Sequence, residues 1–193
     1  AFGTISSGKS SLLNALAGRD VFRTDAKGGT TLRRSQVPWP GMDRVTLVDT
    51  PGLGEVDGQQ RGADSARAAK DADLVLLVVD GPLRNTEFEL MRRLAPMEKR
   101  VLVCLNKEDW YNEQEKDKLL GQIAGQVKQY VAAEDVVAVR SNPIRHTRVR
   151  VLPDGKEVAE TVEVSINIDT LARRMMALAA RNGRDLLLAN LLL

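Results

Sequence analysis

The sequence predicts an α/β fold in which helices cover both faces of a largely parallel sheet. Apolar runs bounded by turn signals alternate with helical patterns along the 193 residues, which is typical of this class. Two of the runs, LVLLVVD (74–80) and RVLVCLN (100–106), are apolar at successive positions, as strands buried on both faces are. A glycine-containing loop, GTISSGKSS (3–11), leads into the first helical pattern.

The strands are predicted from four apolar runs, at residues 45–50, 74–80, 100–106 and 136–141. Residues 33–39 predict a poorer strand at a sheet edge, because Pro38 lacks the N–H group that a central strand needs.

The helical patterns lie between these runs, at residues 9–17, about 62–70, 86–95 and 113–131. In the last of them Leu119, Ile123, Val127 and Tyr130 recur at helical spacing, which predicts one buried stripe.

The pattern changes after Ser141. Pro153, Asp154 and Gly155 form a strong turn signal between two alternating stretches, and we expect a β-hairpin there. A final helix is predicted to begin near Asp169, a plausible N-cap. Its apolar stripe of Leu171, Met175 and Leu178 should pack on the sheet.

The first strand of the expected hairpin carries Arg145, His146, Arg148 and Arg150, which we expect to form one basic face. That face is either a solvated edge or a docking surface for an acidic partner, and the sequence leaves both readings open.

Composition excludes several function classes. The chain is 43% hydrophobic and 28% charged, as ordinary globular proteins are, and its net charge of +2 gives no evidence for nucleic acid as a partner. Its one cysteine, Cys104, allows no internal disulfide, so we expect a cytoplasmic protein with this thiol packed in the core. No apolar stretch approaches the roughly 20 residues that span a bilayer.

Both ends of the sequence suggest a piece of a longer protein. Ala1 and Phe2 could be only the last residues of the strand that such a loop normally follows. The chain ends within LLLANLLL (186–193), an apolar run that either pairs with another chain or leads into a membrane-seeking region. We therefore keep membrane association through the C-terminal continuation as an expectation.

The loop at residues 3–11 has the spacing of a phosphate-binding loop. Glycines allow the dihedrals with which successive backbone N–H groups point inward at phosphate oxygens. Lys9 adds a positive charge toward the β- and γ-phosphates, and the following helix presents its positive end to the same anion. The expected nucleotide-binding residues of this loop are Gly3, Ser6, Ser7, Gly8, Lys9, Ser10 and Ser11.

A second motif, VDTPG (48–52), predicts the metal shell. Asp49 ends a predicted strand near the Ser10 hydroxyl, and both oxygens suit Mg²⁺. Gly52 can sense the γ-phosphate through its backbone N–H. In the loop between the two motifs we expect Thr31, with Thr30 as the alternative, to ligate Mg²⁺ and the γ-phosphate.

NKED (106–109) predicts guanine as the base. The Asp109 carboxylate can accept from the guanine N1–H and amino groups, whereas adenine would leave it unpaired. Asn106 can bind the base and brace the phosphate loop, and the stem of Lys107 can lie across the ring. Ser141 can offer its backbone N–H to the guanine O6.

In this order and spacing, the motifs GTISSGKS, Thr30-Thr31, DTPG and NKED resemble the translation-factor-class GTPases, with the Era/TrmE/EngA-like branch nearest and dynamin-like GTPases more distant. The resemblance covers about residues 1–142, a GTP-binding domain that residues 143–193 would complete. It implies a three-layer α/β/α fold with a mixed, mostly parallel six-stranded sheet, and nucleotide bound at the carboxyl ends of its strands.

The resemblance also implies slow or partner-assisted GTP hydrolysis, with Lys9, Thr31 and Gly52 as catalytic candidates. Leu53 stands where many small GTPases have a water-orienting glutamine; Gln59 or Gln60 could replace it or be solvated loop residues.

Some relatives use a potassium ion held by an asparagine where this chain has Ser6, so potassium stimulation stays open. Arg33 and Arg34 could contact phosphate, although an exposed pair is more often surface charge.

Two functions remain in view. The first is a GTPase switch whose switch regions, at about residues 24–34 and 50–62, become ordered with GTP and engage an effector or a second copy. The second is a GTP-dependent scaffold with negligible turnover, and an ATP-specific enzyme is a distant third.

Overall fold

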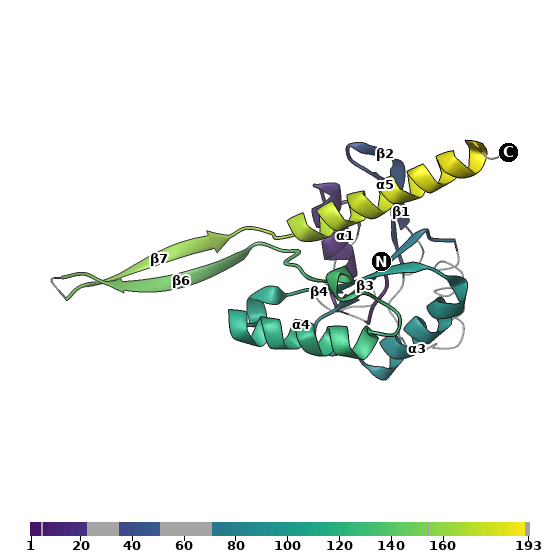
Figure 1. The fold of residues 1–193 in the computed structure, drawn as a ribbon. Coiled ribbons are helices and arrows are strands. Elements are labelled where there is room, and N and C mark those ends of the chain that lie inside the picture. The colour runs from purple at the N-terminus through teal and green to yellow at the C-terminus, as the bar shows by residue number, and fades with distance from the viewer. Residues whose placement is uncertain (5, 23–34, 51–70, 154, 192–193) are drawn as a thin grey trace.

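Figure 1 shows the computed structural model, which describes residues 1–193 apart from residue 5 and residues 23–34, 51–70, 154 and 192–193. The helix expected at about 62–70 lies outside the described residues, as do the candidates Thr30, Thr31, Gly52 and Leu53.

The central strands form the predicted parallel sheet. β3 (Leu74–Val79), β4 (Arg100–Leu105) and β5 (Val136–Ala138) pair in the order β3-β4-β5. β5 is shorter than the expected strand at 136–141, although the Val139 N–H still donates to Leu105 O at 2.8 Å.

An antiparallel pair and the N-terminal residues extend this sheet. β1 (Ser35–Trp39) pairs only with β2 (Met42–Asp49) among the described strands, as expected for an edge strand that contains Pro38. The Ala1 ammonium donates to Val48 O of β2, and Phe2 bridges to β3 in parallel. Residues 1–2 therefore lie between β2 and β3. They join the antiparallel pair to the parallel strands, which makes the sheet mixed.

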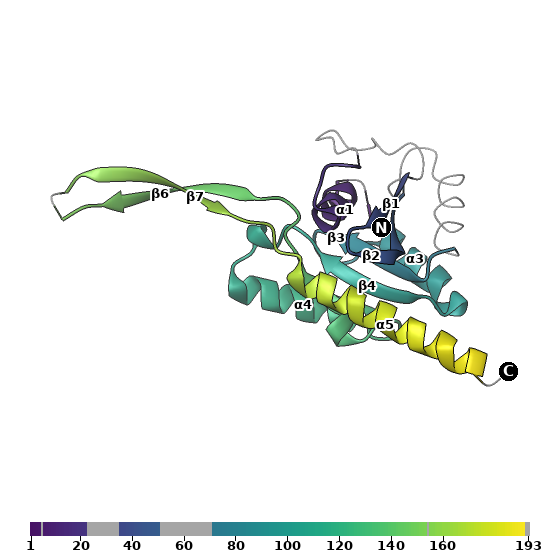
Figure 2. The same cartoon turned by 90° about the horizontal axis from the view of Figure 1, so that it is seen from above.

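Alternate residues of β3 separate two apolar cores, because successive strand side chains point to opposite faces. Val75, Leu77 and Val79 pack with α3 (Asn85–Leu94) and α4 (Glu113–Val127). Leu76 and Val78 pack with α1 (Lys9–Ala17) and α5 (Asp169–Leu191). Figures 1 and 2 show these helix pairs on opposite sides of β3 and β4, which confirms the predicted α/β fold.

The helices agree with the predicted ranges within a few residues. α1 begins and ends as expected, whereas α4 ends at Val127 rather than at residue 131. Tyr130 is 37% exposed, so its assignment to the buried stripe was wrong; Val131, four residues after Val127, takes that place. Short 3₁₀ turns lie at Ala95–Met97 (η1), Glu108–Trp110 (η2) and Ala133–Asp135 (η3).

The predicted apolar stripe of α5 is buried: Leu171, Met175 and Leu178 lie in the core beside α1. Cys104 is buried as well, and burial raises the pKa of its thiol to about 12. This thiol is therefore a core packing group, as the sequence predicts.

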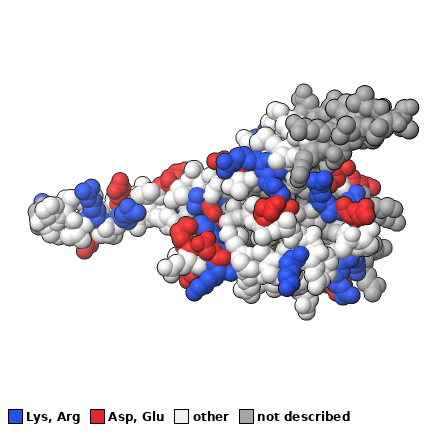
Figure 3. Space-filling view, in the orientation of Figure 1, with Lys and Arg blue, Asp and Glu red and all other residues white. Residues whose placement is uncertain are grey.

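The predicted hairpin is a long two-stranded ribbon, β6 (Ile144–Val151) and β7 (Glu157–Val164), that projects away from the layered part (Figures 1 and 2). The expected single basic face was wrong. His146, Arg148 and Arg150 share one face by strand alternation, but Arg145 lies on the other and pairs with Glu163 at 3.3 Å. Figure 3 shows charges of both signs along the ribbon.

Within the part of the chain that the structure describes, no helix is both long enough and apolar enough to cross a membrane.

Candidate nucleotide-binding site

Two glycines shape the loop between residues 3 and 11. Gly8 has φ +90°, and a Cβ on it would lie 2.2 Å from the Nδ2 of Asn106. A Cβ on Gly3 would lie 2.1 Å from the backbone oxygen of Val78. Only glycine can fill these positions without moving a neighbour, so the loop is held against the carboxyl ends of β3 and β4.

The loop lysine lies inside the cradle. Lys9 is buried, and its Nζ donates to the Thr4 backbone oxygen at 2.9 Å. The Ser7 hydroxyl donates to the same oxygen at 3.0 Å. Burial lowers the pKa of the Lys9 ammonium, and the Asp49 and Glu87 carboxylates act in the opposite direction. An ammonium with this little water around it is suited to a strong anion.

The expected metal ligands Ser10 and Asp49 lie together. The Ser10 hydroxyl donates to Asp49 Oδ2 at 2.6 Å, while the Thr50 N–H donates to Oδ1 at 3.0 Å. A hydroxyl and a carboxylate oxygen beside an anion cradle are the ligands that Mg²⁺ takes when phosphates complete its shell. These residues therefore fit the predicted ion. Among the described residues there is no cluster of three or more His, Cys, Asp or Glu that could hold a metal by itself.

Asn106 joins the loop to the expected base-binding corner. Its Nδ2 donates to Ser7 O at 3.0 Å, and its Oδ1 accepts from the Ser141 N–H at 3.3 Å. The residues expected to read guanine are thus connected to those expected to hold phosphate.

Two further base-site candidates follow Asn106. Lys107 has φ +60°, and its Nζ lies 3.1 Å from Asp80 Oδ2 and 4.4 Å from the ring centroid of Trp110. Asp109 is half-buried, and its carboxylate has no hydrogen-bond or ion-pair partner within the described ranges. The Asp109 oxygens can therefore accept hydrogen bonds from a ligand.

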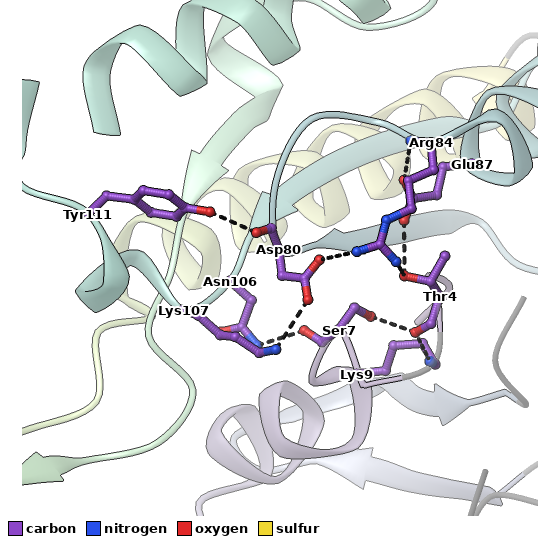
Figure 4. Close-up of polar contacts among 9 residues, drawn as sticks. All are labelled: Thr4, Ser7, Lys9, Asp80, Arg84, Glu87, Asn106, Lys107 and Tyr111. Carbon is purple, nitrogen blue, oxygen red and sulfur yellow. Dashed lines mark hydrogen bonds and ion pairs between the residues drawn. The ribbon is translucent and has the colours of Figure 1, made fainter. Parts of the chain in front are cut away.

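Sequence reasoning missed an acidic residue at the centre of this region. Asp80 directly follows β3 and accepts from Lys107 and from Arg84 Nη2 at 3.2 Å, while its backbone oxygen accepts from the Tyr111 hydroxyl at 2.9 Å (Figure 4). The available signal was its position: Asp80 is a polar residue directly after the carboxyl end of a buried strand, and ligands bind at such ends.

A second missed contact fixes the start of the loop to α3. The Thr4 hydroxyl donates to Glu87 Oε1 at 3.3 Å and accepts from Arg84 Nη1 at 3.2 Å (Figure 4). Glu87 also accepts from the Arg84 backbone N–H at 2.7 Å, which ties its carboxylate to the start of α3. Glu87 is 1% exposed, and burial raises the pKa of its carboxyl. No local sequence pattern indicates a contact between residues 83 apart.

A cavity of about 360 Å³ adjoins the base-binding corner. It lies between α1 and residues 141–143, and its lining includes Ser11, Ser141 and, from the segment after the hairpin, Ile166.

The structure thus brings the described site candidates together at the carboxyl ends of the strands. They come from the loop before α1 and the first turn of α1, from the end of β2 and from the segments after β4 and β5: Gly3, Ser6, Ser7, Gly8, Lys9, Ser10, Ser11, Asp49, Asn106, Lys107, Asp109 and Ser141. The catalytic candidates Thr31 and Gly52 lie outside the described residues.

Comparison with known proteins identifies relatives. Residues 1–107 match the family described as 50S ribosome-binding GTPase. The tRNA modification GTPase MnmE of Nitratidesulfovibrio vulgaris is 40% identical over 114 residues, which cover 55% of this chain and 24% of that protein. GTPase Era of Histophilus somni is 32% identical over 138 residues, 68% of this chain and 45% of the relative. The chain therefore spans less than half the length of either curated relative.

A solved structure supports the same relationship. An Era variant of Aquifex aeolicus, bound to GDP·AlF4⁻, superposes with a TM-score of 0.63 at 25% identity, covering 72% of this chain and 49% of that one. The predicted resemblance to Era-like and MnmE-like (TrmE-like) GTPases is confirmed, and with it the assignment to proteins that bind guanine nucleotides. The chain belongs to the 50S ribosome-binding GTPase family of P-loop GTPases.

Proposed function

We propose that this chain is a nucleotide-dependent switch that binds GTP with Mg²⁺ and hydrolyses it to GDP and phosphate. The observation that carries the proposal is the double contact of Asn106, which ties the phosphate loop to the segment after β5. The residues joined by Asn106 can then recognise both the phosphate end and the base end of one nucleotide.

The phosphate end is assigned to the loop. Backbone N–H groups of residues 6–11 face the phosphate oxygens in this proposal, and Gly8 gives the chain the turn that this requires. Lys9 exchanges the Thr4 carbonyl for the β- and γ-phosphates, a stronger acceptor for its buried charge.

The proposed protein ligands of Mg²⁺ are Ser10 and Asp49, which contact each other in the structure, and Thr31. Bound there, the ion would neutralise charge on the phosphate oxygens during attack by water. Gly52 is assigned to sense the γ-phosphate. Potassium, with Ser6 as its ligand, belongs to this proposal as an accessory ion.

The base end is assigned to the segments after β4 and β5. Asp109 accepts from the N1–H and amino groups of guanine, Lys107 covers the ring, and the Ser141 N–H turns from Asn106 to the guanine O6. These contacts select guanine over adenine, because adenine has neither an N1–H nor a 2-amino group to donate to the Asp109 carboxylate.

A second candidate function keeps GTP binding without turnover. Leu53 in place of glutamine favours it, because nothing at that position can orient water. Such a scaffold would act in the cytoplasm or beside a membrane reached through the continuation of α5. In either case we assign the switch segments to an effector protein or a second copy of the chain.

Calorimetry and phosphate release separate these readings. We expect the full chain to bind GDP and GTP but not ATP, and Asp109→Asn to shift its preference toward xanthine nucleotides. Phosphate release should be slow and should be measured in potassium and in sodium. Binding without release in either salt would favour the scaffold, and absence of guanine-nucleotide binding would refute both functions.

A further inference from the structure

The segment that leaves the hairpin, residues 165–167, is fastened to both segments assigned to guanine. Arg140 and Asn167 form an antiparallel bridge with N···O distances of 2.8 Å in both directions. The Arg140 Nε also donates to Ser165 O at 2.8 Å. We call Glu108, Arg140 and Asn167 the hairpin-root junction.

Glu108 is the centre of this junction. It lies between Lys107 and Asp109, is 7% exposed, and its Oε1 accepts from Asn167 Nδ2 at 2.8 Å. The Arg140 guanidinium lies 3.8 Å from the same oxygen, and Lys116 of α4 lies 3.9 Å from Oε2. Burying a carboxylate with so little water around it is costly, and these three partners offset part of that cost.

Two residues of the junction, Glu108 and Arg140, are each followed directly in the chain by a proposed base contact. Asp109 follows Glu108 within the single turn of η2, and Ser141 follows Arg140. The Glu108 N–H donates to Val139 O at 3.2 Å, so the two segments are also joined through the backbone. Because the Asp109 carboxylate has no partner in the described structure, its direction is set by the backbone that Glu108 anchors.

We propose that Asn167 is a positioning residue for guanine recognition, acting through Glu108 to align the Asp109 carboxylate with the base. This inference deepens the proposed function and rests on it. Residues 165–167 are then part of the nucleotide site, and the presence of Ile166 in the lining of the base-side cavity agrees with that placement.

The test compares GDP with IDP, whose inosine base lacks the 2-amino group of guanine. The ratio of their dissociation constants reports the alignment of Asp109, whereas a general loss of folding raises both constants together. We expect Asn167→Ala to lower the IDP-to-GDP ratio by a factor of about three to ten. Gln122→Ala, which truncates an exposed amide on α4, should leave the ratio unchanged.

Asn167→Asp sharpens the test because it keeps the shape of the side chain and replaces a donor with a carboxylate that repels Glu108. The ratio should fall at least as far as in Asn167→Ala. Adding Glu108→Gln exchanges donor and acceptor across the 2.8 Å contact, so the double variant should recover most of the ratio.

The outcomes separate this inference from the proposed function. Failure of the unaltered chain to bind GDP would overturn both. Tight GDP binding with an unchanged ratio in Asn167→Ala and Asn167→Asp, or with no recovery in the double variant, would overturn the positioning role alone.

Discussion

At the scale of single residues, Gly8 shows how a local constraint creates the cradle. In Gly8→Ala the left-handed backbone costs about 1–2 kcal/mol, and the new Cβ meets the amide that joins the loop to the base corner. We expect GDP affinity by calorimetry to fall at least tenfold. Gly18→Ala is the matched control: its φ is +65° and nothing lies within 4 Å, so it should lose stability but keep affinity.

Lys9 illustrates a conflict between stability and binding. Because its pKa in the folded state lies below 10.5, the unfolded chain holds this proton more strongly, and the free energy of unfolding rises with pH between the two pKa values. This gain in the free energy of unfolding is fully present above pH 10.5 and is lost as the pH falls through the pKa of Lys9 in the folded chain. Lys9→Met removes that rise and the buried charge.

We therefore expect nucleotide-free Lys9→Met, in urea titrations at neutral pH, to be more stable than the unaltered chain by about 1 kcal/mol, while its GTP affinity falls at least a hundredfold. A less stable variant would show that the contact with Thr4 outweighs the burial of charge.

At the scale of elements, agreement with the sequence depends on whether local signals decide the boundary. α1 matches its prediction because Gly8 and Gly18, both with positive φ, delimit it. α4 does not, since periodicity alone cannot tell Tyr130 from Val131 as the next buried position. For β6 the alternation could be read from the sequence, but the predicted basic face placed residues 145 and 146 together. Successive residues of a strand point to opposite faces, so these two cannot share one.

The hairpin contributes no residue to either of the two apolar cores in the described structure. β6 and β7 are exposed along most of their length, and a lone two-stranded ribbon is only marginally stable. Replacing residues 145–163 with Asn-Gly joins the paired Ile144 and Val164. We expect the free energy of unfolding to change by less than about 1 kcal/mol and GDP affinity to persist.

The matched variant replaces residues 145–167 and so also removes Asn167, together with its contacts to Glu108 and Arg140. This larger deletion should weaken GDP binding, because it takes away the hairpin-root junction. If both deletions weakened GDP binding equally, the ribbon itself would support the site.

At the scale of the whole molecule, the sequence predicts candidate nucleotide-binding residues but not the contacts that hold them together. Motifs with fixed spacing identify Lys9, Asp49 and Asn106 because the chemistry of phosphate, metal and base requires those residue types. The contacts from Thr4 to Glu87 and from Glu108 to Asn167 join residues 83 and 59 apart. Such pairs depend on tertiary packing, which no local pattern reports.

The same tertiary arrangement predicts how a ligand stabilises the molecule. A nucleotide would join the loop before α1 to the segments after β4 and β5, so it should bind only the folded chain. At 100 times its dissociation constant GDP should add about 2.7 kcal/mol and raise the melting temperature by about 5–10 °C. ATP should have no effect, and chelation of Mg²⁺ should reduce the shift with GTP. In Asp109→Asn, XDP should restore the shift that GDP loses; a variant that still responds to GDP alone would contradict the assigned base contact.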